Sequence, residues 1–345
     1  MQDRRQLLAS LGAAGLAMAL PATPARARER PAKPPRLVPG AKVGLVAPAG
    51  FLADRFDLEL AREAIAAMGL VPVAGANLFE RFGYLAGSDR ARAADINAMY
   101  ADPSIRALFA LRGGWGSARI LSYLDWRAIR INPKLLIGFS DITALHLAFA
   151  ARAGFPTIHG PTAASAWSKF SWEHFRELAF EAKLPLLTNP PGDDDRLVQR
   201  ENRTRTITPG KASGRLLGGN LTVLAHLVGT PWLPDFSGAL LFLEDVDEAE
   251  YRIDRMLTQL GQAGILRRLA GVVFGQCTNC RGSGPSYGGF TLTDILDQHL
   301  KPLGVPAYQG ALFGHVDDQF SLPVGCRAEI DAAAGTIRLL EAPVA

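Results

Sequence analysis

The sequence predicts an α/β protein built on a parallel sheet, and three observations support this fold class. Short apolar runs of strand length alternate with segments whose apolar residues recur at helical spacing. Most of these runs end abruptly in glycine, proline or serine, which mark turns. The 345 residues exceed the size of one ordinary hydrophobic core. We therefore expect a parallel sheet covered by helices on both faces, followed by a second domain.

The first domain is expected at residues 41–183, where strands and helices alternate most regularly. The run after Lys42 is apolar, which is typical of a strand buried on both faces. Ser88 stands directly before a segment of helical spacing and can cap its first turn. The expected strands are 42–47, 70–73, 106–111, 134–137 and 157–158, and the expected helices are 56–68, 89–100, a segment beginning at Ser117, and 141–151.

Residues 184–212 lose this periodicity and fill with proline, aspartate, asparagine and arginine, which indicates an interdomain linker. A smaller α+β domain is expected at 213–345. It should contain helices at 221–228, opened by Gly218-Gly219-Asn220, and at 253–262, with strands at 240–243, 272–275, 311–313 and 328–330.

The amino terminus has the pattern of an export signal. The pair Arg4-Arg5 precedes an apolar run at 11–20, and Ala25-Arg26-Ala27 is a small-x-small cleavage site. We expect residues 1–27 to be a twin-arginine-type signal that directs the protein to the periplasm, followed by a proline-rich tether at 28–40. The alternatives are an ordinary secretory signal or a retained anchor, although the run is too short for a stable membrane span.

The charge and the cysteine content argue against several kinds of function. The formal charge is +4, and much of it lies in the first thirty residues, so nucleic-acid binding has no electrostatic support. Cys277 and Cys280 form a C-x-x-C that could be a redox pair or half a zinc site, but there is no second pair to complete a zinc ribbon. Buried or incidentally paired thiols are the expectation, the state of Cys326 is open, and no metal or cofactor is predicted.

Residues 112–117, Arg-Gly-Gly-Trp-Gly-Ser, form a glycine-rich turn between a strand and a helix. Ligands gather at the carboxyl ends of parallel strands. Free N–H groups at such a turn favour an anion, and Ser117 would be held on a rigid edge. The turn lacks the ending of a P-loop and is not a G-x-S-x-G elbow. A phosphate cradle, a nucleophile and a plain structural turn remain open.

A nucleophilic serine needs a base and a carboxylate. Four of the six histidines, His146, His174, His226 and His299, lie in helical segments and are expected to have packing or surface roles. His315 and His159 follow strands, and His315 is preferred as the base.

Glu244 ends the apolar run 240–243, where an unpaired carboxylate would be costly to bury. The alternative is a solvated acidic edge or, less often, a hard-metal site. The neighbouring acids are Asp245, Asp247, Glu248 and Glu250.

Six motifs in order from about Val43 to the C-terminus together resemble those of the LD-carboxypeptidases. They are YLAGS (84–88), RGGWGS (112–117), GFSDIT (138–143), GGNL (218–221), FLED (242–245), and GH (314–315) followed by LPVG (322–325). The family contains muramoyltetrapeptide carboxypeptidases and microcin C immunity peptidases.

The resemblance implies a serine peptidase with the triad Ser117, Glu244 and His315 and an acyl-enzyme intermediate. It also implies a flavodoxin-like N-terminal domain that supplies the serine, a smaller C-terminal domain that supplies the other two residues, and a homodimer. The implied substrate is a peptidoglycan stem tetrapeptide, which loses its terminal D-alanine. Many relatives act in the cytoplasm, whereas the signal here predicts the periplasm.

Two other functions are weighed against this one. A microcin-immunity-type peptidase would use the same triad on peptidyl or aminoacyl nucleotides. A noncatalytic phosphate- or nucleotide-binding protein would use only the glycine-rich turn.

Further residues are expected to contact the substrate. Backbone N–H groups near Gly114 and Ala118 are candidates for an oxyanion hole. Arg112 could bind the substrate carboxylate, or could form a structural ion pair. Trp115, Asn220 and Ser140 are expected to line the pocket.

Overall fold

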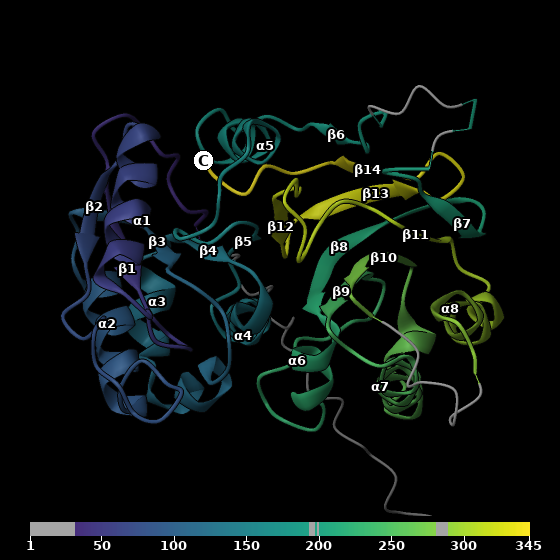
Figure 1. The fold of residues 1–345 in the computed structure, drawn as a ribbon, viewed down its shortest axis with the longest axis horizontal. Coiled ribbons are helices and arrows are strands. Elements are labelled where there is room, and N and C mark those ends of the chain that lie inside the picture. The colour runs from purple at the N-terminus through teal and green to yellow at the C-terminus, as the bar shows by residue number, and fades with distance from the viewer. Residues whose placement is uncertain (1–31, 193–196, 199, 281–288) are drawn as a thin grey trace, which may run out of the picture. The chain divides into compact units, whose positions relative to one another are not determined.

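The computed structural model describes residues 32–192, 197–198, 200–280 and 289–345 (Figure 1). The expected signal at 1–27 and the start of the tether lie outside these residues. Within the described part, the strands form two sheets, of six and eight strands. None of the described helices is long and apolar enough to cross a membrane.

The first sheet has the strand order β12-β5-β4-β3-β1-β2. Its strands are β1 (Lys42–Val46), β2 (Val71–Ala74), β3 (Ile105–Ala110), β4 (Leu135–Gly138), β5 (Thr157–His159) and β12 (Leu322–Val324). The first five are parallel to their neighbours, and β12 is antiparallel to β5. The order 2-1-3-4-5 is that of the flavodoxin-like fold, so the predicted fold class is confirmed.

Helices cover both faces of this sheet. They are α1 (Arg55–Ala67), α2 (Asp89–Ala101), α3 (Trp126–Ile131), α4 (Thr143–Arg152) and α5 (Lys169–Ala179), with 3₁₀ helices η1 (Ser117–Tyr123) and η2 (Ser140–Ile142). Adjacent strand residues face opposite ways. Phe109 therefore packs with α1 and α5, while Leu108 packs with α2 and α4. As predicted, Ser88 caps α2, by accepting from the Ala91 N–H.

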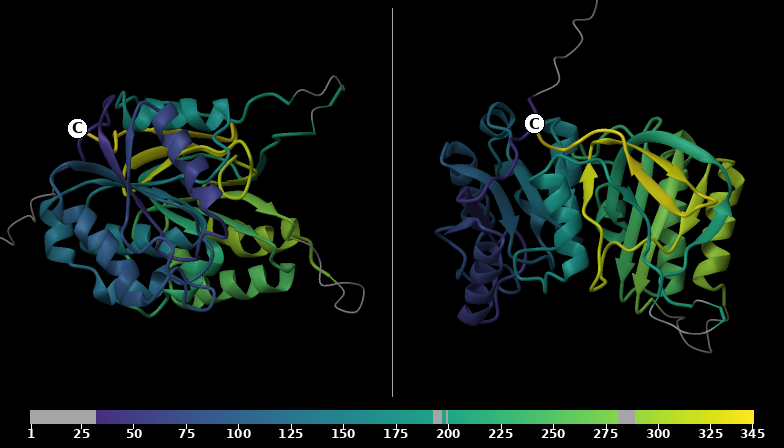
Figure 2. Two further views of the ribbon diagram at one scale, coloured as in Figure 1. Left: turned by 60° about the vertical axis from the view of Figure 1, so that its left-hand side comes forward. Right: turned by 90° about the horizontal axis from the view of Figure 1, so that it is seen from above.

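The second sheet has the order β6-β14-β13-β8-β9-β10-β11-β7, and its strands from β8 to β11 are parallel. The strands are β6 (Leu186–Leu187), β7 (Arg205–Thr208), β8 (Lys211–Asn220), β9 (Leu240–Val246), β10 (Gly271–Thr278), β11 (Ala307–Gln309), β13 (Arg327–Asp331) and β14 (Thr336–Leu339). The helices are α6 (Leu221–His226), α7 (Glu250–Gln262) and α8 (Leu292–Leu300), with 3₁₀ helices η3 (Leu266–Arg268) and η4 (Lys301–Leu303). Helices α7 and α8 lie side by side, drawn in green and yellow-green in Figure 2.

Three expectations differ from the structure. The predicted linker contributes β6, β7 and the start of β8 to the second sheet. The strand expected at 311–313 is a loop, and β12 from the expected second domain instead extends the first sheet. Strands β6, β7 and β12 are two to four residues long, too short to show a periodic pattern in the sequence.

The expected tether is packed from Lys33 onward. The Lys33 ammonium donates to the carbonyl of Ala342, and Leu37 is 1% exposed. The two sheets also share one hydrophobic cluster, which includes Leu145 of α4 and Leu224 of α6. This shared core fixes the loops of one sheet against those of the other.

Candidate functional site

Ser140 lies at the turn between β4 and α4. The buried run Leu135–Gly138 forms β4, Phe139 follows, and Ser140 then begins η2. Its φ is +64°, in the left-handed region that residues other than glycine rarely adopt. Such backbone strain at a strand-to-helix turn is typical of a side chain presented for function. Ser140 is half-buried, so its hydroxyl is within reach of a ligand.

His315 lies in the loop between β11 and β12 and reaches Ser140. Its Nε2 is 3.0 Å from the Ser140 Oγ. The imidazole packs edge-on against Phe139, with ring centroids 4.9 Å apart. The Thr278 hydroxyl donates to the His315 carbonyl oxygen at 2.6 Å and holds the backbone of the loop. The histidine is therefore fixed on its ring and on its main chain.

Glu244 completes the series on the other side of the imidazole. It lies in β9 and is fully buried, and its Oε2 is 2.7 Å from the His315 Nδ1. Gly314 makes this approach possible, because a Cβ there would lie 2.5 Å from Oε2. A hydroxyl, an imidazole and a buried carboxylate are thus linked in order.

The charges around His315 favour its protonated form. Burial disfavours the imidazolium, but the hydrogen bond and charge of Glu244, with Asp245 and Asp247, raise the pKa of His315 above its ordinary value. The carboxylate also selects the tautomer that has its proton on Nδ1, which leaves Nε2 as an acceptor facing Ser140.

Ser117 does not join this series, which corrects the prediction that it is the nucleophile. It is fully buried. Its N–H donates to Asp141 Oδ2 at 2.7 Å, and its hydroxyl donates to the Asp141 carbonyl at 2.5 Å. Its hydroxyl is therefore directed at the backbone of the Ser140 turn. Through these two hydrogen bonds, Ser117 links the glycine-rich turn to the turn that contains Ser140.

The glycine-rich turn is also held from the side of α2. The guanidinium of Arg92, 2% exposed, donates to the Gly116 carbonyl at 2.8 Å. Gly114 and Gly116 have φ of +109° and +118°, which require glycine. Gly113 lies against the site, because a Cβ there would be 3.0 Å from the Ser140 Oγ. The turn thus forms a rigid wall beside Ser140.

The position of Ser140 changes which N–H groups are candidates for an oxyanion hole. Ala118 was a candidate because it follows Ser117, so it is no longer a candidate if Ser117 is not the nucleophile. The N–H of Asp141 follows Ser140 directly, and it lies 3.3 Å from the position of a Cβ on Gly113. The backbone of Gly113 and the N–H of Asp141 therefore both lie close to the Ser140 side chain.

Arg112 and Trp115 line a hollow of about 480 Å³ on the outer side of the same turn. Its other lining residues are Gly50, Phe51, Tyr84 and Gly114. The Arg112 guanidinium donates to the Phe51 carbonyl at 3.1 Å, and among the described residues no ion pair of Arg112 is found. The predicted role of Arg112 in binding a carboxylate stays a prediction.

Asn220 makes structural hydrogen bonds, and its expected place in the lining of the pocket stays a prediction. Its Oδ1 caps α6 by accepting from the Val223 N–H at 3.1 Å. Its Nδ2 donates to Asp245 Oδ1 at 3.0 Å. Both ends of the amide are committed, and the residue is 5% exposed. Burial raises the pKa of Asp245 to about 6 although several donors surround it.

His159, the second candidate for the base, is fully buried, and neither of its ring nitrogens has a hydrogen-bond partner among the described residues. Burial lowers its pKa well below the ordinary value, and the nearby His146 and His315 lower it further. His159 packs against Phe139 and Phe242, with ring centroids 6.2 and 5.4 Å apart. His159 therefore has a packing role next to Phe139, the residue that precedes Ser140.

Cys277 and Cys280 form a disulfide, and Cys326 is a buried free thiol. Within the described ranges, no three His, Cys, Asp or Glu residues lie together as a metal site would require.

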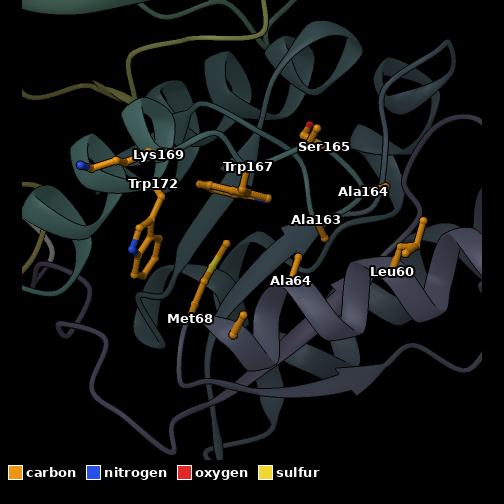
Figure 3. A pocket seen from close by; sticks show the side chains of 11 residues that line it. Leu60, Ala64, Met68, Ala163, Ala164, Ser165, Trp167, Lys169 and Trp172 are labelled. Atoms are coloured by element: carbon orange, nitrogen blue, oxygen red, sulfur yellow. The ribbon is translucent and has the colours of Figure 1, made fainter.

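A second cavity, of about 570 Å³, lies between α1 and the segment entering α5 (Figure 3). It is mostly apolar, and Met68, Trp167 and Trp172 line it together with Lys169. None of the residues that line it belongs to the Ser140 site.

Linked hydroxyl, imidazole and carboxylate groups at the edge of a flavodoxin-like sheet are of the class that nucleophilic hydrolases use. The comparisons agree with this class. Models of the LD-carboxypeptidase N-terminal and C-terminal domains match residues 43–160 and 213–330. The chain belongs to the LD-carboxypeptidase family, a family of peptidases.

Individual relatives match over most of their length. A carboxypeptidase homologue from Streptomyces coelicolor is 39% identical over 89% of this chain and 96% of its own. The murein tetrapeptide carboxypeptidase of Pseudomonas aeruginosa is 34% identical over 84% of this chain and 93% of its own. The structure of MccF, a microcin C7 self-immunity protein, in complex with glutamyl sulfamoyl guanosine has a TM-score of 0.82 at 22% identity and covers 91% of this chain and 100% of its own. At this low sequence identity, the similarity to MccF shows a shared fold and no more.

Sequence reasoning named Glu244 and His315, which the structure brings together, but it gave Ser140 only a place in the lining of the pocket. A signal was present: Gly138-Phe139-Ser140 follows a buried strand directly and leads into a helix. This is the context of a nucleophile elbow without its last glycine.

Proposed function

We propose that this protein is a serine carboxypeptidase that removes the terminal D-alanine from peptidoglycan stem tetrapeptides, with Ser140 as nucleophile, His315 as base and Glu244 as the supporting carboxylate. The observation that carries the proposal is the linked pair of short contacts, 3.0 Å from Ser140 to His315 and 2.7 Å from His315 to Glu244. Membership of the family and the name of the Pseudomonas relative support the substrate class.

In the proposed reaction, His315 Nε2 takes the proton of the Ser140 hydroxyl as Oγ attacks the carbonyl carbon of the scissile amide. Glu244 stabilises the imidazolium that forms. The imidazolium then protonates the nitrogen of the leaving D-alanine, and the C–N bond breaks to give an acyl-enzyme. Water, deprotonated by His315, hydrolyses the ester and restores the Ser140 hydroxyl.

The tetrahedral intermediate carries an oxyanion, which needs donors already in place. The N–H of Asp141 and those of the Gly113–Gly114 turn are the candidates that we propose for this role, and one such donor is typically worth about 3 kcal/mol. Arg112, in the adjacent hollow, would bind the free carboxylate of the terminal residue. A requirement for that carboxylate would make the enzyme an exopeptidase.

The test is incubation of the purified protein with soluble muropeptides, followed by mass spectrometry and an assay of free D-alanine. Release of D-alanine by the wild-type protein, and not by Ser140→Ala, is expected. Release from wild-type and Ser140→Ala alike would reject the serine mechanism. Hydrolysis of an aminoacyl sulfamoyl nucleotide without any action on tetrapeptides would favour the microcin-immunity type of activity instead. Inertness toward both, with no labelling of Ser140 by a fluorophosphonate, would favour a noncatalytic role.

We also propose that the mature protein is exported to the periplasm and forms a homodimer, from the amino-terminal signal pattern and the family resemblance. Fractionation of cells that express the full chain, with Arg4→Lys/Arg5→Lys as the control, tests export. Sedimentation equilibrium of the processed protein tests the dimer.

A further inference from the structure

The disulfide between Cys277 and Cys280 closes a four-residue loop at the end of β10. The loop contains Thr278 and Asn279, and both cysteines are half-buried, so a small reagent can reach the bond. Asn279 has φ of +56°, in the left-handed region. Holding such a turn costs conformational entropy, which a covalent link reduces.

This loop contacts the segments that carry His315 and Glu244. The Thr278 hydroxyl donates to the His315 carbonyl at 2.6 Å. The Thr278 carbonyl accepts from the Asp247 N–H at 2.9 Å. In the strand ladder, Cys277 is paired with Asp245, the neighbour of Glu244. One short loop therefore links the backbones that hold the imidazole and the carboxylate.

We propose that the Cys277–Cys280 disulfide, acting through Thr278, is a positioning element for His315 and makes the activity of the site sensitive to redox state. The inference rests on the proposed function and adds a form of regulation to it. An external dithiol reduces the bond by thiol–disulfide exchange. Two electrons and two protons pass to Cys277 and Cys280, which become thiols, and the dithiol leaves as its own disulfide. The unlinked loop releases Thr278, and His315 loses the restraint on its backbone.

If the backbone of His315 is less restrained, the chemical step should suffer more than substrate binding. Reduction is therefore expected to lower kcat by about tenfold or more with KM little changed, because small misplacements of catalytic groups are costly. Far-UV circular dichroism should be unchanged, since the loop spans four residues and its two cysteines are only partly buried at the margin of the hydrophobic core.

The experiment uses the purified protein carrying Cys326→Ala, so that one cysteine pair remains. D-alanine release is measured after treatment with dithiothreitol and again after reoxidation with oxidised glutathione. The expected result is loss and recovery of kcat. Cys277→Ser/Cys280→Ser should be slow and insensitive to both reagents. Thr278→Val should be slow in the oxidised state, and Thr278→Ser should restore the wild-type response. An unchanged kcat on verified reduction would overturn the inference.

A second measurement separates this inference from the proposed function. The pKa of His315 is followed by nuclear magnetic resonance in the oxidised and reduced protein. Weaker contact with Glu244 should lower it in the reduced form. If the pKa moves but no carboxypeptidase activity exists, the proposed function fails and the positioning role stands. If tetrapeptides are cleaved and neither kcat nor this pKa responds to reduction, the positioning role is rejected.

Discussion

The Ser140 hydroxyl lies 3.0 Å from Nε2 of His315, although 175 residues separate the two positions in the chain. Ser140→Ala should therefore lower kcat by roughly 10⁴-fold, because the attacking atom is removed and little else is disturbed. The loss is measured as the initial rate of D-alanine release. The melting temperature should stay close to that of the wild-type protein, since Ser140 is half-buried and its φ is strained.

Ser117→Ala is the matched variant at the serine that the sequence favoured. It removes one hydrogen bond, to the Asp141 carbonyl, from a buried position. The expected cost is about 1 kcal/mol of folding stability, with a kcat reduced far less than in Ser140→Ala. Equal losses of activity in the two variants would show that Ser117 takes part in the chemistry.

Glu244→Gln should move the pH dependence of the reaction. The Glu244 carboxylate stabilises the imidazolium, so His315 keeps its proton to a pH above the usual range for histidine. Since the base must be neutral, kcat/KM should rise with pH, with a midpoint set by this raised pKa. In Glu244→Gln the midpoint should shift to lower pH and kcat should fall. A midpoint at the same pH in both proteins would mean that another group titrates.

Gly113→Ala tests the wall beside the nucleophile. Its added Cβ would lie 2.8 Å from the Cβ of Ser140 and 3.0 Å from its Oγ, so Ser140 must shift. A drop in kcat of about 10²-fold is expected, since displacements of this size misalign catalytic groups. The control is Gly261→Ala in α7, where the nearest atom is 3.9 Å away and alanine favours the helix. That variant should be fully active and slightly more stable.

The sequence was sufficient for the inner strands of both sheets, because these strands are apolar and buried on both faces. Leu135–Gly138 and Leu240–Val246 stand out for this reason, and so does Glu244 as an acid at the end of such a run. The short edge strands gave no such pattern. β12 has three residues, one of them proline, and it pairs with β5 only because the chain returns from the second sheet.

The choice of serine depended on packing that a sequence pattern does not contain. Ser117 and Ser140 follow neighbouring strands, β3 and β4, so both were expected at the same sheet edge. Asp141 distinguishes the two serines. Its carboxylate accepts from the Ser117 N–H, and its carbonyl accepts from the Ser117 hydroxyl, which is therefore directed away from the sheet edge. The glycines that suggested a nucleophile at Ser117 instead let the turn pass close to Ser140.

Arg112→Ala should weaken binding of substrates that end in a free carboxylate. Arg112 faces the hollow next to the Gly113–Gly114 turn, and its one described hydrogen bond is to the Phe51 carbonyl. KM for a free-acid tetrapeptide should rise by about tenfold or more, as when a charge-assisted hydrogen bond is lost. A C-terminally amidated tetrapeptide should show no such rise. Equal penalties on the two peptides would contradict the carboxylate-binding role.

Asn220→Ala distinguishes a structural role from a role in binding substrate. The change removes the cap of α6 and a donor to the buried carboxylate of Asp245. The free energy of unfolding, measured with urea, should fall by about 2 kcal/mol or more, because a lost cap costs about 1 kcal/mol and a lost hydrogen bond to a charged group costs at least as much again. The Val246 N–H still donates to Asp245 Oδ1, so this oxygen keeps one partner. Ser88→Ala, which removes a single cap in α2, should lose only about 1 kcal/mol. KM should be unchanged in Asn220→Ala, and a raised KM with undiminished stability would return Asn220 to the substrate pocket.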